Sequence, residues 1–138
     1  MTDSWTRVAL GVVMSTVLWA TPAHAAADGI SSGPEAAALV GVTDLQAHGG
    51  SVSGSLVNKS GRVVRDVQLL IRYVWQWADE RHPGTNNPGR SAFYTVPGDL
   101  SPGGSLSFSY EASPPLPRRS DGSFTTTVDV VGFAEVGD

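Results

Sequence analysis

The segment Val67–Trp77 constrains the fold most, because its residues separate by polarity with a period of two. Its odd-numbered positions are all apolar, namely Val67, Leu69, Ile71, Tyr73, Trp75 and Trp77. Its even-numbered positions are mixed, namely Gln68, Leu70, Arg72, Val74 and Gln76. A strand sends alternate side chains to opposite faces, whereas a helix would mingle these two sets around its axis. We therefore expect a long β-strand whose odd face looks into the core.

Other segments repeat this pattern. Leu106, Phe108 and Tyr110 alternate with serines, the stretch 124–135 is rich in β-branched residues, and weaker strands are expected near 40–47, 51–56 and 92–96. Clusters of Gly, Pro, Asn and Ser separate these runs, including Pro97-Gly98-Asp99, and no helical period lies between them. The sequence predicts an all-β domain over residues 40–136, an immunoglobulin-like antiparallel β-sandwich of six or seven strands.

The N-terminal residues 1–25 have the pattern of a secretory signal peptide. Arg7 precedes an apolar run over residues 8–20, and Ala23-His24-Ala25 supplies small residues at the expected cleavage site. That apolar run has 13 residues, fewer than the roughly 20 that a membrane-spanning helix needs. We expect cleavage after Ala25, export to the periplasm or the medium, and a flexible lead-in over residues 26–39.

Charge and cysteine content exclude several classes of function. The chain carries nine Arg and Lys against 13 Asp and Glu, and residues 1–25 hold one of each sign, so the expected mature chain keeps a net charge of −4. This balance argues against nucleic-acid binding through a broad cationic surface. The absence of cysteine excludes disulfides and a thiolate nucleophile. No later segment is apolar enough to suggest a transmembrane helix in the mature chain.

Three stretches carry a resemblance to a known family. They are Val52–Gly61 (VSGSLVNKSG), Val64–Leu70 (VRDVQLL) and Leu100–Phe108 (LSPGGSLSF). In order and spacing they resemble small bacterial FxLYD-type extracytoplasmic domains, over roughly Val52 to Tyr110. The resemblance implies a bacterial β-sandwich module and brings no catalytic residues with it.

The motifs of common catalytic sites are missing from the sequence. There is no Gly-x-Ser-x-Gly nucleophile elbow, no pair of carboxylates in an apolar setting and no phosphate-binding glycine loop before a helix. Asp79, Glu80 and His82 include metal-ligating types, but Pro and Gly residues follow them and favour a solvated loop tip over a metal site. We expect no enzyme activity and no cofactor.

Two further motifs have a structural and a functional interpretation. Asn58-Lys59-Ser60 matches the N-glycosylation acceptor pattern, but with Gly61 it also suits a turn between strands, which we favour. Pro114–Arg119 resembles a polyproline II ligand with basic ends, and we favour a stiff loop that leads into the last strand.

The tryptophans at the end of the long strand suggest the candidate site. Trp75 is expected in the core, whereas Trp77 lies where the sequence turns polar. We expect Trp77 either in the core or on an exposed aromatic surface beside Arg90, Phe93 and Tyr94. Trp77, Arg90 and Tyr94 form the candidate partner-binding surface, for a protein partner or a glycan. The sequence thus predicts an exported, non-enzymatic binding or protein-interaction module. The alternatives are a structural accessory subunit of an envelope assembly, pairing through an edge strand, and a small hydrolase or metal-dependent enzyme.

Overall fold

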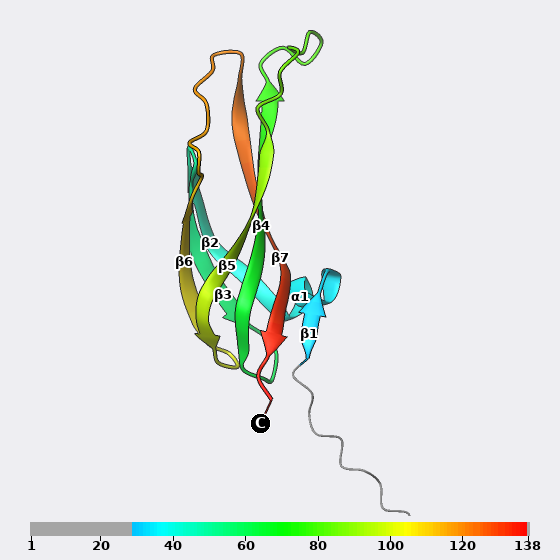
Figure 1. The fold of residues 1–138 in the computed structure, drawn as a ribbon, viewed down its shortest axis with the longest axis vertical. Helices are drawn as coiled ribbons and strands as arrows, with labels where there is room; N and C mark the ends of the chain where they lie inside the picture. Colours follow the sequence, from blue (N-terminus) through cyan, green and yellow to red (C-terminus); the bar gives the residue numbers. More distant parts are fainter. Residues whose placement is uncertain (1–28, 138) are drawn as a thin grey trace, which may run out of the picture.

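The computed structural model describes residues 29–137, which form two antiparallel β-sheets packed face to face with one short helix beside them (Figure 1). The elements are β1 (Ile30–Ser32), α1 (Pro34–Leu39), β2 (Val40–His48), β3 (Ser51–Asn58), β4 (Val64–Trp77), β5 (Arg90–Leu100), β6 (Ser105–Glu111) and β7 (Gly122–Glu135). The expected signal peptide, residues 1–25, lies outside the described residues. The helix that is described is too short to cross a membrane.

The strands divide into sheets of four and three. The first sheet has the order β1-β7-β4-β5 and the second has the order β2-β3-β6, and all pairings are antiparallel. The predicted all-β sandwich is confirmed. Immunoglobulin constant domains also have four and three strands, in the orders A-B-E-D and C-F-G, so this chain shares their architecture but connects its strands differently.

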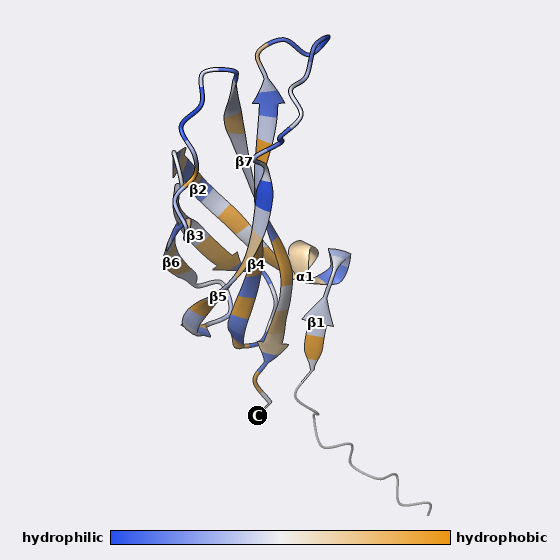
Figure 2. Ribbon diagram, turned by 45° about the horizontal axis from the view of Figure 1, so that its top comes forward, coloured by the Kyte–Doolittle hydropathy of each residue, from blue (hydrophilic) through white to orange (hydrophobic). Residues whose placement is uncertain are grey.

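The long strand β4 is the centre of the core, as its period of two predicts. Its odd-numbered residues from Val67 to Trp75 are buried, with Tyr73 only 1% and Trp75 only 5% exposed. Apolar and polar bands alternate along β4 in Figure 2. Across the sandwich, Val52, Leu56 and Phe108 of the second sheet close the same core. Burying a side chain such as Ile71 contributes about 1.5–3 kcal/mol, so this one face supplies much of the stability.

Within the expected flexible lead-in, residues 26–39, the structure has the strand β1 and the helix α1. Ile30 pairs with Ala134 as β1 adds to the edge of β7, and α1 buries Ala36 completely. An isolated helix of six residues is unstable in water. Here Pro34 at the start of α1 sets the first helical φ, and contact with the core stabilises the turn.

The cluster Pro97-Gly98-Asp99, expected as a turn, instead lies inside β5. The register with β4 shifts between Arg65 and Val67, and Gly98 adopts a φ of 107°. This is a β-bulge, in which the extra residue is accommodated without ending the strand. β5 is therefore longer than the strand expected over residues 92–96.

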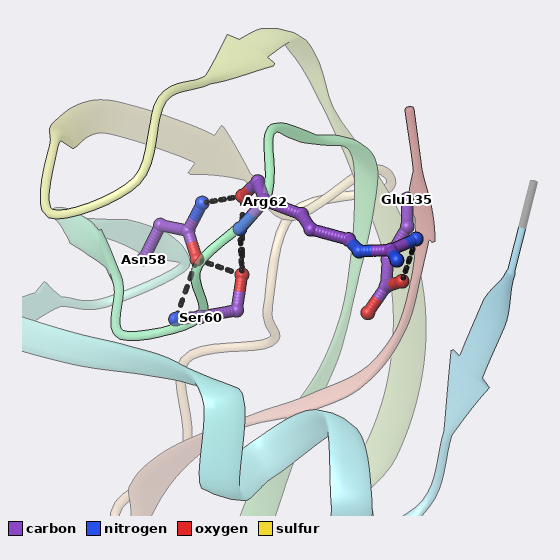
Figure 3. Close-up of polar contacts among 4 residues, drawn as sticks. All are labelled: Asn58, Ser60, Arg62 and Glu135. Atoms are coloured by element: carbon purple, nitrogen blue, oxygen red, sulfur yellow. Dashed lines mark hydrogen bonds and ion pairs between the residues drawn. The ribbon is translucent and has the colours of Figure 1, made fainter. Parts of the chain in front are cut away.

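Asn58 is fully buried and fixes the connection between β3 and β4 through hydrogen bonds to Ser60 and Arg62 (Figure 3). Its Nδ2 donates to the carbonyl oxygens of Arg62 at 2.6 Å and Leu100 at 2.9 Å. Its Oδ1 accepts from Ser60 N at 2.9 Å and Ser60 Oγ at 2.6 Å. Both donors and both acceptor positions are thus used, and the turn interpretation of Asn58-Lys59-Ser60 is confirmed.

Candidate functional site

The candidate surface lies where β4 and β7 run beyond the rest of the sandwich (Figure 1). β5 pairs with β4 only as far as Tyr73, opposite Arg90, whereas β7 follows β4 to Trp77, opposite Gly122. The last four residues of β4 therefore form a two-stranded ribbon with β7. The loops 78–89 and 112–121 surround this ribbon, and Ala78 N donates to Asp121 O at 3.0 Å.

The inner face of the ribbon is an aromatic cluster of Trp75, Trp77 and Phe124. The rings of Trp75 and Phe124 meet edge to face with centroids 4.8 Å apart, and those of Trp75 and Trp77 with centroids 6.0 Å apart. Such geometries contribute about 0.5–1.5 kcal/mol per pair beyond the area buried. The prediction that Trp75 belongs to the core is confirmed. Its Nε1 is buried and makes no hydrogen bond among the described residues.

Arg119 covers this aromatic cluster. Its guanidinium lies 5.3 Å from the Trp75 ring centroid and 5.4 Å from that of Trp77, within the range of a cation–π interaction. Its Nε donates to Asp121 Oδ1 at 2.9 Å, and its Nη1 donates to Asn86 O at 2.5 Å. The hydrogen bond from Arg119 holds the pKa of the Asp121 carboxyl below its ordinary value. Arg119 thereby connects the two loops across the tryptophans.

Trp77 is partly buried beneath the loop that follows β4. A Cβ placed on Gly84 would lie 2.7 Å from the Trp77 ring, so the loop backbone rests directly on the indole. Arg119 covers the ring as well. Trp77 thus stabilises the loops, and its ring is not an open flat surface.

The other two candidate residues lie farther down the same face of the sheet. Arg90 donates a hydrogen bond to Pro114 O and so holds the proline-rich loop. The ring of Tyr94 packs against Tyr110 of the opposite sheet, with centroids 5.3 Å apart. Tyr94 pairs with Leu69, eight residues before Trp77 on β4, which corresponds to roughly 26 Å along the strand. The structure therefore does not bring Trp77, Arg90 and Tyr94 together in one site.

Asp79 and His82 contact each other at the tip of the loop 78–89. His82 Nδ1 lies 3.0 Å from Asp79 Oδ2, and this hydrogen bond lowers the pKa of the Asp79 carboxyl from its ordinary value. Both side chains are exposed. Within residues 29–137 no three His, Cys, Asp or Glu side chains lie close enough to hold a metal ion.

The most exposed aromatic side chain of the described residues is Phe93, on the face of the first sheet that points away from the core. Phe93 is 65% exposed and lies directly opposite Leu70 of β4, and Val74 on the same face is 40% exposed. We call Leu70, Val74 and Phe93 the outer patch. Arg72 lies between its β4 members, and its Nη1 is 2.8 Å from Asp129 Oδ2.

Sequence reasoning did not assign the outer patch. The sequence did indicate apolar side chains on the outward face of Val67–Trp77, since Leu70 and Val74 interrupt the polar residues at its even-numbered positions. The sequence placed Phe93 beside Arg90 and Tyr94 at a possible aromatic surface with Trp77, but which of these side chains point outward depends on the register between β4 and β5.

A comparison with protein-family models finds none that matches the chain, and comparisons with curated proteins and with solved structures find no match either.

Proposed function

We propose that this chain is an exported, non-enzymatic protein-interaction module of the FxLYD-like kind, and that its partner binds the outer patch. The observation that carries the proposal is the 65% exposure of Phe93 opposite Leu70, with Val74 exposed farther along the same face. Apolar side chains that adjoin on a sheet and point away from the core are typical of partner-binding surfaces. The N-terminal pattern of residues 1–25 supports action outside the cytoplasm.

The surroundings of the outer patch favour a protein partner. Thr125 and Thr127 on β7 form a polar rim beside the outer patch, and the Arg72–Asp129 ion pair lies between Leu70 and Val74. An apolar centre with a polar rim is the usual arrangement of a protein–protein interface. The tryptophans offer no open aromatic face on which a glycan could stack, because Trp77 is covered by Arg119 and Gly84.

The test places a photo-reactive amino acid at Phe93 of the full chain in the cell that makes it. Illumination should give one discrete cross-linked partner in the exported fraction. Ser107 is the matched control, because it is exposed on β6 and points away from the core on the opposite sheet. The purified partner should bind the Phe93→Lys variant at least about tenfold more weakly, as expected for a central apolar contact.

Two results would contradict the proposal. One is equal cross-linking from Phe93 and Ser107, which would mean that the outer patch has no specific partner. The other is a chain that stays in the cytoplasm and still begins at Met1, where N-terminal sequencing should instead find Ala26.

A further inference from the structure

We infer that the partner of β5 is a second copy of this chain, with the two β5 strands paired antiparallel about a twofold axis at Phe93. The pairing would join two four-stranded sheets into one continuous sheet. This inference rests on the proposed function and names the partner that covers Phe93.

β5 is the outer strand of its sheet, and among the described residues it pairs only with β4. Alternate residues of such a strand direct their backbone N–H and C=O groups outward, where they are ready to pair with another strand. Of the other three edges, β1 and β2 are short or interrupted. β1 has three residues, and β2 contains a bulge between Thr43 and Gln46 in which Asp44 adopts a φ of 53°. Bulges and short strands are the usual means of blocking edge pairing. The third, β6, pairs with β3 in unbroken register, but its exposed side chains are Ser105, Ser107, Ser109 and Glu111, so it offers no apolar side chain to bury.

The regular part of β5 is symmetric about Phe93. It runs from Arg90 to Val96, between the loop that ends at Gly89 and the bulge that begins at Pro97. Opposite residues in antiparallel strands face the same side, so a twofold axis normal to the sheet must lie midway between one residue and its own copy on the second strand. Phe93 is the middle of these seven residues, and an axis there uses the whole regular segment.

The side chains fit this register. Phe93 lies opposite Phe93 of the second copy on the outer face, where the two exposed rings cover each other. Ser91 lies opposite Thr95, and the small Ala92 lies opposite the large Tyr94. Arg90, the one charged residue of the segment, lies opposite Val96, so no like charges meet.

The expected dimer is weak. Seven residues of strand pairing bury less than the roughly 1,600 Å² of a standard stable interface. We expect a dissociation constant on the order of 10–100 µM, in the weak range of small interfaces.

Sedimentation velocity of the mature protein between about 5 µM and 1 mM tests the association. The native chain should shift from monomer to dimer as its concentration rises. The variant Phe93→Lys should weaken the dimer at least about tenfold, because two ammonium groups would face each other across the axis. Ser107→Lys, on the exposed face of β6, should leave the dissociation constant of the dimer unchanged. Circular dichroism confirms that each variant folds.

Cysteine pairs test the register, since the native chain has no cysteine. A mixture of Ser91→Cys and Thr95→Cys proteins should form the mixed disulfide under mild oxidation far faster than either variant pairs with itself. Two copies of Ser91 would lie four residues apart along the strands, about 13 Å, which is too far for a disulfide.

The inference is overturned by a native chain that stays monomeric at every concentration, by a dimer that Phe93→Lys does not weaken, or by a dimer with no excess of the mixed disulfide. A monomeric chain whose Phe93 probe still captures another protein overturns only this inference and leaves the proposed function standing. A monomeric chain that gives no specific cross-link at Phe93 overturns both.

Discussion

Replacing Tyr73 by phenylalanine and by alanine separates two contributions to the stability of the sandwich. Tyr73 is 1% exposed in the middle of β4, and its hydroxyl donates to Gly50 O at 2.8 Å. Gly50 O also accepts from Ala112 N at 3.0 Å, so Tyr73→Phe leaves no buried acceptor without a partner. We expect Tyr73→Phe to cost about 1 kcal/mol, the usual net value of one hydrogen bond. Tyr73→Ala also removes the ring and leaves a cavity, for a cost of about 4 kcal/mol.

The same substitution predicts a change at alkaline pH. Burial raises the pKa of the Tyr73 hydroxyl above its ordinary value of about 10, and the nearby Tyr110 and Glu111 add to this while Arg90 opposes it. The unfolded chain therefore releases this proton first as the pH rises. The contribution of Tyr73 is fully present below about pH 10 and is lost as the pH rises through the raised pKa of the folded protein. Tyr73→Phe should accordingly lose less stability between about pH 9 and 11 than the native chain does.

Urea unfolding followed by tryptophan fluorescence measures both effects, with the slope of each transition checked for constancy. Tyr94 and Tyr110 remain in the native chain and in Tyr73→Phe, so the difference between their pH profiles isolates Tyr73. The reasoning is refuted if Tyr73→Phe destabilises as much as Tyr73→Ala at pH 7. Parallel profiles of the native chain and Tyr73→Phe up to pH 11 would refute the pKa argument.

Three further substitutions probe contacts at the two ends of the sandwich. Asn58→Asp should cost about 3 kcal/mol or more, because it buries a carboxylate and removes the donors to two carbonyl oxygens, and urea midpoints measure this. Arg119→Ala should raise acrylamide quenching of Trp77 in a variant that keeps it as the sole tryptophan, since the guanidinium covers the ring; unchanged quenching would contradict this contact. Gly122→Ala should cost about 2 kcal/mol or more, because its Cβ would collide with the backbone oxygen of Gln76 in β4. Gly61→Ala, with open space around it, should be close to neutral, and urea midpoints measure both variants.

The amino-acid sequence determined which face of the long strand β4 is buried. The polarity of Val67–Trp77 repeats every two residues, and side-chain direction in a strand has the same period, so the core positions of β4 follow from local order alone. The turn at Asn58-Lys59-Ser60 was predictable for a similar reason, because its hydrogen bonds to Ser60 join residues two apart.

Only the tertiary structure decided which residues from distant segments contact each other and which side chains of β5 are exposed. Arg119 meets Trp75 from a loop 44 residues away, and α1 is stable because Ala36 contacts a core that remote strands build. Phe93 is exposed because the register of β5 against β4 turns it outward opposite Leu70. These contacts depend on which strands become neighbours and in what register. The strand order and register are those that minimise the free energy of the whole sandwich, so they cannot be predicted from any single segment.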